Sequence, residues 1–169
     1  MRDKVVPFVK GTETRLNIRV NPQRRSMKGM LLLFVEPYTA GTRDSEKYIF
    51  PDLKKVSITV NGSPNMLYNN GIESRDMWEE AKRFFVKEKN KTEHKTMQKF
   101  YTEDKFGLLI DLRSMPSQTN HGIVNSKEGI QLEIQREKKG TGTINCHVYT
   151  ICDSQFNIQS KQLESVQYS

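Results

Sequence analysis

Several short segments of the chain alternate strictly between apolar and polar residues. The apolar members of the three clearest segments are Leu16, Ile18 and Val20, then Val56, Ile58 and Val60, and then Ile130, Leu132 and Ile134. A period of two residues is typical of a β-strand with one face buried and the other in water. Asn61-Gly62 follows the second segment directly. Because this dipeptide supplies a positive φ at low energetic cost, we expect a tight turn there.

Other segments predict further strands. Residues 30–35 form a continuous apolar run between Gly29 and Pro37, which is too short for a typical helix and favours a strand buried on both faces. The remaining predicted strands or extended pieces cover residues 47–50, 66–68, 106–112, 144–151, 156–158 and 163–168. Many short strands separated by Gly, Pro and Asn turns favour a sandwich or jelly roll. We therefore predict an all-β fold, an antiparallel jelly-roll sandwich of about eight strands with an inserted α-helical excursion.

The predicted helix begins at Ser74, a residue type common at helix N-termini. Apolar residues then recur at helical spacing, at Met77, Trp78, Ala81, Phe84 and Phe85. This apolar face must pack on the sheet, so we expect the indole of Trp78, the sole tryptophan, to be buried. The charged residues 87–99 predict a loop and a short second helix that ends near Tyr101. The helical insertion thus covers residues 74–101.

Length bounds the domain organisation. A chain of 169 residues fits one ordinary domain, which buries roughly 70% of the surface of its unfolded chain. We predict a single jelly-roll domain over residues 1–169, with residues 1–11 as a flexible N-terminal arm. Two cysteines do not make a disulfide framework, and no apolar run near the N-terminus would serve as a signal peptide or span a membrane. The expectation is a protein that is not secreted.

The net charge is +7, and the excess of basic residues lies in two segments. Residues 1–28 hold a net charge of +6 and residues 82–99 hold +5, whereas the rest of the chain is slightly acidic. Solvated surface explains both segments. Contact with an acidic partner, either nucleic acid or an acidic patch on a neighbouring subunit, explains them as well. On this second interpretation the candidate contact residues are Arg24, Arg25, Lys87, Lys89, Lys91 and Lys95.

Residues with catalytic or metal-binding chemistry are sparse. Some jelly rolls are cupins, which hold a metal on closely spaced histidines, but His94, His121 and His147 lie far apart in this sequence. Cys146 and Cys152 lack metal-ligand spacing. The sequence contains no glycine-rich phosphate loop, nucleophile elbow or paired-carboxylate motif. We therefore expect no enzyme activity, no catalytic residues, no cofactor and no metal.

Two local patterns predict where polar side chains lie. His147 is expected to face out of its strand, while Cys146 and Val148 face in. Asp111 and Arg113 occupy alternate positions at the end of an apolar strand. An ion pair between these two residues would fix the following loop, which is a structural role rather than a functional one.

Three stretches of the sequence together resemble a known family. They are residues 46–85, which hold the strand, turns and helix described above, Arg24-Arg25-Ser26 before Leu31-Leu32-Leu33-Phe34, and Leu109-Ile110-Asp111-Leu112-Arg113-Ser114 before His121-Gly122. The combination looks like the C-terminal jelly-roll half of the double jelly-roll major capsid proteins of Polinton or adintovirus-type DNA viruses and transposons. The similarity runs from about Thr12 to Tyr168 and rests on dispersed fold and turn residues. Proteins of that family have two jelly rolls, and this chain has room for one.

The resemblance implies a structural function. The chain would be a subunit of a viral capsid shell, or a fragment of one, which builds pseudo-hexameric trimers with other capsid subunits in the virion. It would make at most weak, non-specific contact with nucleic acid, and it would have no catalytic residues. A second hypothesis, from a different class, is a jelly-roll binding module for nucleic acid or carbohydrate, encoded by a domesticated capsid-derived gene and located inside a host cell.

Overall fold

The computed structural model describes most of two β-sheets and part of the segment inserted between them. The described residues are 2–8, 14–20, 27–37, 41, 47–65, 68–80, 97–103, 106–112, 129–137, 143–152, 155–159 and 162–167. The strands are β1 (Arg2–Phe8), β2 (Arg15–Val20), β3 (Met27–Val35), β4 (Leu53–Val60), β5 (Ser63–Pro64), β6 (Ile72–Glu73), β7 (Leu108–Asp111), β8 (Ile130–Arg136), β9 (Ile144–Cys152), β10 (Gln155–Gln159) and β11 (Gln162–Gln167). The helical segments are η2 (Ser74–Asp76), which residues 77–80 continue, and α2 (Met97–Thr102).

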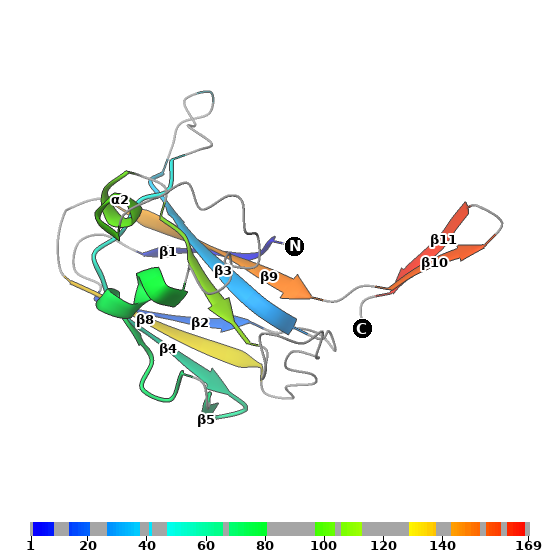
Figure 1. Cartoon of the computed structure of the whole chain (residues 1–169), viewed down its shortest axis with the longest axis horizontal. Coiled ribbons are helices and arrows are strands. Elements are labelled where there is room, and N and C mark those ends of the chain that lie inside the picture. The colour runs from blue at the N-terminus through cyan, green and yellow to red at the C-terminus, as the bar shows by residue number, and fades with distance from the viewer. Residues whose placement is uncertain are drawn as a thin grey trace.

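Strand pairing follows the order of one long hairpin that has been rolled up (Figure 1). β1 pairs with β9, β2 with β8, β3 with β7 and β4 with β6, all antiparallel. Further pairing of β3 with β9 and of β4 with β8 joins these ribbons into two sheets. One sheet has the order β1-β9-β3-β7 and the other β2-β8-β4-β5, with β6 also on β4. The result is an antiparallel jelly-roll sandwich, as predicted.

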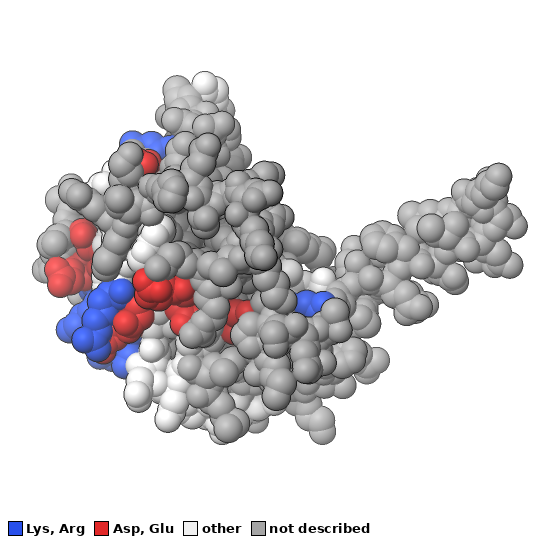
Figure 2. All heavy atoms as spheres, in the orientation of Figure 1, with Lys and Arg blue, Asp and Glu red and all other residues white. Residues whose placement is uncertain are grey.

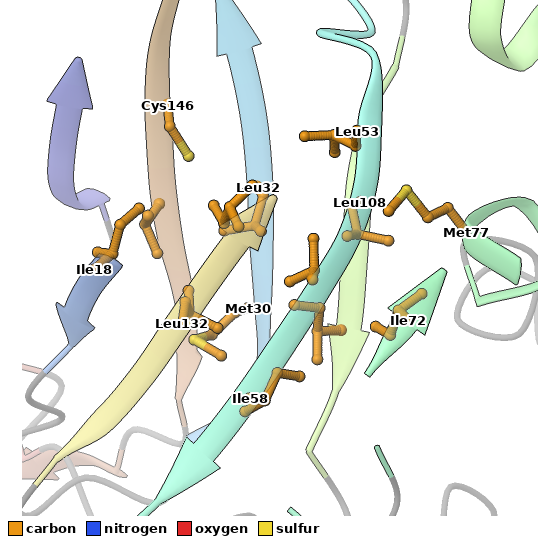
Figure 3. Close-up of a cluster of buried hydrophobic side chains, with 14 of the residues drawn as sticks. Ile18, Met30, Leu32, Leu53, Ile58, Ile72, Met77, Leu108, Leu132 and Cys146 are labelled. Carbon is orange, nitrogen blue, oxygen red and sulfur yellow. The ribbon is translucent and has the colours of Figure 1, made fainter. Parts of the chain in front are cut away.

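A hydrophobic core fills the space between the sheets (Figure 3). In β2 every second residue is buried, which confirms the alternation read from the sequence. Met30 and Leu32 on β3 lie across the core from Leu132 on β8, and all three are fully buried. The prediction that residues 30–35 are buried on both faces is largely confirmed: none of them is exposed, and on the outer face of the sheet Val35 is buried while Leu31 and Leu33 are half-buried.

One predicted strand is absent. Residues 47–50 contain only an isolated bridge at Tyr48. Two backbone hydrogen bonds hold this segment: the Ile49 N–H donates to the Phe34 carbonyl at 3.0 Å, and the Phe106 N–H donates to the Tyr48 carbonyl at 3.0 Å. The segment leads from β3 in one sheet towards β4 in the other. A chain that changes sheets cannot pair along its length with either, so its apolar residues pack on the core without forming a strand.

The loop between β4 and β6 also differs from its prediction. Tyr68 lies in a tight turn rather than in an extended piece, and Met66 and Leu67 fall outside the described residues. The Gly71 N–H closes this turn by donating to the Tyr68 carbonyl at 2.8 Å. Both predicted Asn-Gly turns contain the expected positive φ, which is 50° at Asn61 and 73° at Gly71.

Both ends of the chain depart from the predicted organisation. Residues 1–11 were expected to form a flexible arm, but Arg2–Phe8 is β1 and pairs with β9. The edge of β9 offers backbone hydrogen-bond partners to residues 2–8. The sequence of residues 2–8 alone does not indicate this pairing. Residues 156–158 and 163–168 do not complete the sandwich. Their described part forms β10 and β11, a separate two-stranded sheet that Figure 1 shows apart from the sandwich.

The helical insertion lies between β6 and β7, as predicted. Ser74 is the first residue of η2 rather than its cap, because Glu73 occupies the N-cap position and makes no capping side-chain hydrogen bond. Asp76 lies in the first turn, where a negative charge favours a helix. α2 ends at Thr102, next to the predicted end at Tyr101. Residues 81–96, which include Ala81, Phe84 and Phe85, fall outside the described residues.

Candidate functional site

Aromatic side chains gather where the helical insertion meets the sandwich. Phe106 is at the centre of the cluster with 1% of its surface exposed. Its ring centroid lies 4.9 Å from that of Phe50 and 5.0 Å from that of Phe100. Trp78 reaches Phe100 at 5.1 Å. These rings therefore anchor the insertion to the core. The predicted packing of Trp78 against the core is confirmed, although its indole is half-buried rather than fully buried.

Tyr68 connects the turn before β6 to β7 and to the insertion. Its hydroxyl oxygen lies 3.0 Å from Glu80 Oε2 and 3.1 Å from the Asp111 carbonyl, two acceptors for its one proton. The same oxygen accepts the Asp111 N–H at 3.2 Å. Burial, reinforced by the Glu80 carboxylate, raises the pKa of Tyr68 above its usual range. A phenol held neutral in this way ties three segments together, which is a structural task.

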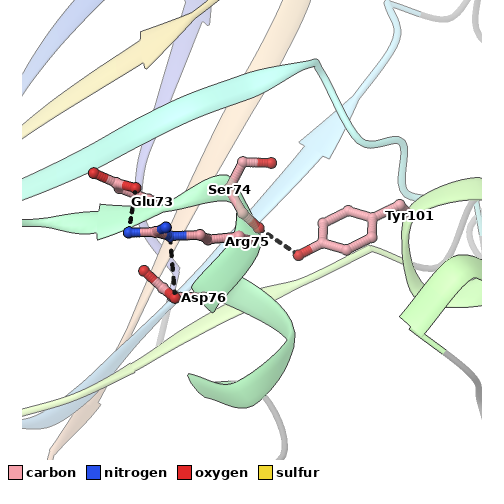
Figure 4. A network of polar contacts seen from close by, with 5 residues as sticks. All are labelled: Glu73, Ser74, Arg75, Asp76 and Tyr101. Carbon is pink, nitrogen blue, oxygen red and sulfur yellow. Dashed lines mark hydrogen bonds and ion pairs between the residues drawn. The ribbon is translucent and has the colours of Figure 1, made fainter.

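A second polar contact fixes the start of the insertion (Figure 4). The Tyr101 hydroxyl on α2 donates to the Ser74 backbone carbonyl at 2.6 Å. Beside it, the Arg75 guanidinium lies 3.1 Å from a Glu73 carboxylate oxygen and 3.8 Å from an Asp76 carboxylate oxygen. Arg75 is largely exposed, so these ion pairs contribute little to stability. The hydrogen bond from Tyr101 joins the two ends of the insertion.

Histidine and cysteine side chains in β9 have the predicted orientation. Cys146 and Val148 are fully buried in the core, and His147 lies on the opposite face with its ring stacked on Tyr149 at 6.5 Å. Burial raises the pKa of the Cys146 thiol to about 12, so the thiol is protonated and unreactive at neutral pH. Cys146 and Cys152 are not joined in a disulfide bond. Within the described residues, no group of three or more metal-ligating side chains occurs.

The basic residues proposed to contact an acidic partner cannot be placed. Their positions, Arg24, Arg25, Lys87, Lys89, Lys91 and Lys95, all fall outside the described residues. The described residues hold about as many acidic as basic side chains, so the excess of +7 lies in the rest of the chain. On the face shown in Figure 2, described lysine and arginine side chains lie beside acidic ones. His94, His121 and Arg113, and with Arg113 the predicted ion pair to Asp111, also lie outside the described part.

The outer faces of the two sheets differ in polarity. On the sheet that contains β2, the outward residues Arg15, Asn17 and Arg19 are exposed. On the other sheet, β3 and β9 present Leu31 opposite Tyr149, and both are half-buried. Leu33 and Ile151 lie on the same outer face by the strand alternation and are also half-buried. We call Leu31, Leu33, Tyr149 and Ile151 the outer apolar face. On the same face Val35 and Leu109 are 8% and 3% exposed, so this face of the sheet is largely shielded from water.

The sequence did not reveal the role of Tyr68. A tyrosine between asparagine-rich turns is a weak signal of a buried link, and only the fold brings Asp111 to it. None of the helices in the described part of the chain is long and apolar enough to cross a membrane. Comparisons of the chain with models of known protein families, with curated proteins and with solved structures found no match.

Proposed function

We propose that this chain is a structural protein, one jelly roll of a viral or virus-derived capsid subunit that assembles into pseudo-hexameric trimers. The observation that carries the proposal is the pairing of the strands as a rolled-up hairpin. This architecture recurs in viral capsid proteins, in lectin domains and in cupins. The fold alone does not distinguish these classes. The choice between them therefore depends on the chemistry of the side chains.

The side chains favour the capsid class over the cupin class. A cupin holds a metal on closely spaced histidines and a carboxylate, whereas His94, His121 and His147 lie far apart in this sequence. The polar contacts that the structure describes at Tyr68 and Tyr101 are buried or partly buried. They end on backbone carbonyls and one carboxylate, and they join segments of the fold. The resemblance of the sequence to double jelly-roll capsid proteins agrees with this reading.

The binding module for nucleic acid or carbohydrate remains the second candidate, and one observation favours it. The net charge of +7 is concentrated in two segments of the chain. A concentrated positive charge attracts nucleic acid regardless of sequence. A capsid subunit also meets nucleic acid, so the two hypotheses differ in the strength and the selectivity of binding.

Assembly with a second jelly roll tests the proposal. The coding sequence immediately upstream of Met1 should encode a strand-rich domain, and we would produce that domain together with this chain. Light scattering should then report a complex that holds three copies of each domain. A pair of domains that stays separate at high protein concentration, or an upstream sequence without strand patterning, would contradict the capsid proposal.

Salt dependence of nucleic-acid binding distinguishes the second candidate. The capsid proposal predicts weak binding whose affinity falls linearly with salt concentration on logarithmic axes. Changing four lysines to glutamine should flatten that slope, and four lysines from other segments serve as the control. The first set is Lys87, Lys89, Lys91 and Lys95, and the control set is Lys47, Lys54, Lys138 and Lys139. Tight, sequence-selective binding at physiological salt would favour the binding module instead.

A further inference from the structure

Two turns of the sheet that contains β4 hold the same dipeptide, at Asn61-Gly62 and at Asn70-Gly71. Asparagine is a thermolabile residue, and a following glycine has no side chain to hinder the reaction that modifies it. In that reaction the glycine nitrogen loses its proton and attacks the Cγ atom of asparagine, and ammonia leaves. Water then opens the resulting succinimide to aspartate or isoaspartate. Asn61 and Asn70 are both exposed, so exposure of the asparagine does not distinguish the two sites.

The reacting nitrogen of the second site is held by the fold. The Gly71 N–H donates to the Tyr68 carbonyl at 2.8 Å, which engages the proton that the reaction must remove. A Cβ atom at Gly71 would lie 2.9 Å from the Val56 carbonyl oxygen, so the backbone is closely packed there. Tyr68 and Ile72 on either side of the glycine are 6% and 2% exposed. Moving the Gly71 nitrogen towards Asn70 therefore displaces buried neighbours.

The first site is the tip of the β4–β5 hairpin. Val60 pairs with Ser63, which leaves Asn61 and Gly62 as the two turn residues, with φ values of 50° and 78°. Within the described residues the Gly62 N–H has no backbone acceptor. Gly62, Ser63 and Pro64 are all exposed, and β5 lies at the edge of its sheet. Segments with few buried contacts open locally at low free energy. The Gly62 nitrogen can therefore move without disturbing the core.

We propose that Asn61 is a site of spontaneous deamidation in the folded protein, whereas the fold protects Asn70. The Asn61 N–H donates to the Gly129 carbonyl at 3.3 Å, and this bond holds the turn on the side before the reacting nitrogen. Aspartate at position 61 adds a negative charge to the turn. Isoaspartate also lengthens the main chain of the two-residue turn by one atom, which disfavours the pairing of β5. Because β5 is exposed, the modified protein keeps its core and stays folded.

Peptide mass spectrometry of the full chain, incubated at neutral pH, tests the proposal. In the folded protein Asn61 should be deamidated at least about tenfold faster than Asn70, which corresponds to a difference of about 1.4 kcal/mol in the free energy of local opening. In concentrated urea the two rates should converge, because both sites share one dipeptide. Asn61 that reacts no faster than Asn70 in the folded protein would overturn the proposal. A rate ratio that is the same with and without urea would also overturn it.

Two variants test the physical origin of the difference. Tyr68→Phe removes the hydroxyl that bonds to Asp111, so it should speed deamidation of Asn70 and leave that of Asn61 unchanged. An unchanged rate at Asn70 would overturn the proposed protection. Asn61→Gln is the matched control, because glutamine reacts slowly through a larger ring, and it should abolish the fast reaction while Asn70 keeps its rate. A fast reaction that persists in this variant would refute the assignment to Asn61.

Discussion

Replacing Phe106 with alanine is the sharpest test of how the insertion is held. The Phe106 ring lies 4.9 Å from Phe50, 5.0 Å from Phe100 and 6.1 Å from Phe34 and Tyr101, measured between ring centroids. Only 1% of the side chain is exposed. The substitution therefore opens a cavity lined by rigid rings, which cannot collapse easily to fill it.

The size of the effect follows from two contributions. Burial of a phenylalanine side chain contributes about 1.5–3 kcal/mol, and the two closest ring pairs contribute about 1–3 kcal/mol together. Phe106→Ala should therefore lower the free energy of unfolding by about 3–5 kcal/mol, which is the range for deleting a buried aromatic ring. This is a large part of the total of about 5–15 kcal/mol for a typical domain.

Urea unfolding followed by the fluorescence of Trp78 measures this loss, since the indole lies 5.1 Å from Phe100 at the edge of the same cluster. Phe106→Leu is the control, because it keeps most of the volume and should cost clearly less. A loss below about 1.5 kcal/mol for Phe106→Ala would mean that the rings do not pack as described. The insertion would then be held by other contacts.

Three further predictions concern single sites. Tyr68→Phe should lower the free energy of unfolding by about 1–3 kcal/mol in urea, because the buried Asp111 N–H loses its acceptor; no loss would contradict the described link. Gly71→Ala should destabilise clearly more than Gly41→Ala, since both glycines have positive φ but a Cβ at Gly71 would lie 2.9 Å from a backbone oxygen and one at Gly41 would meet nothing within 4 Å; equal thermal midpoints would count against that packing. Burial raises the pKa of Cys146 from 9.0 to about 12, so stability should fall as pH rises from about 9 to about 12. Cys146→Ala should weaken that fall. If the variant and the wild-type protein lose stability equally over this pH range, the Cys146 thiol is accessible to water and the reasoning is refuted.

Alternation in the sequence predicted β2, β8 and β4, which lie side by side in one sheet. The apolar residues of β2 and β8 are buried and their neighbours are exposed or half-buried, because a strand with one wet face records its own orientation in its sequence. The period gives no information about which strand lies alongside. The pairing of β1 with β9 joins segments at opposite ends of the chain, and it depends on the way the whole hairpin rolls up.

The errors have a common physical cause. Ile49 and Phe50 are apolar and half-buried, as strand residues often are, but they lie where the chain changes sheets. Leu31 and Leu33 lie in an apolar run that predicts burial on both faces, and on the outer face the burial is partial at these two residues and nearly complete at Val35. A sequence pattern indicates that a side chain is shielded from water, but tertiary contacts determine which part of the protein shields it.

Electron microscopy of the chain, produced together with the jelly-roll domain that the proposal expects upstream, tests the proposed function most directly. The capsid proposal predicts particles with threefold symmetry and a six-cornered outline, in which each corner is one jelly roll. Class averages should show this outline in the wild-type complex at low salt and at physiological salt alike. Images that contain only single sandwiches or pairs of them, under conditions where both domains are folded, would contradict the proposal that this protein builds a capsid shell.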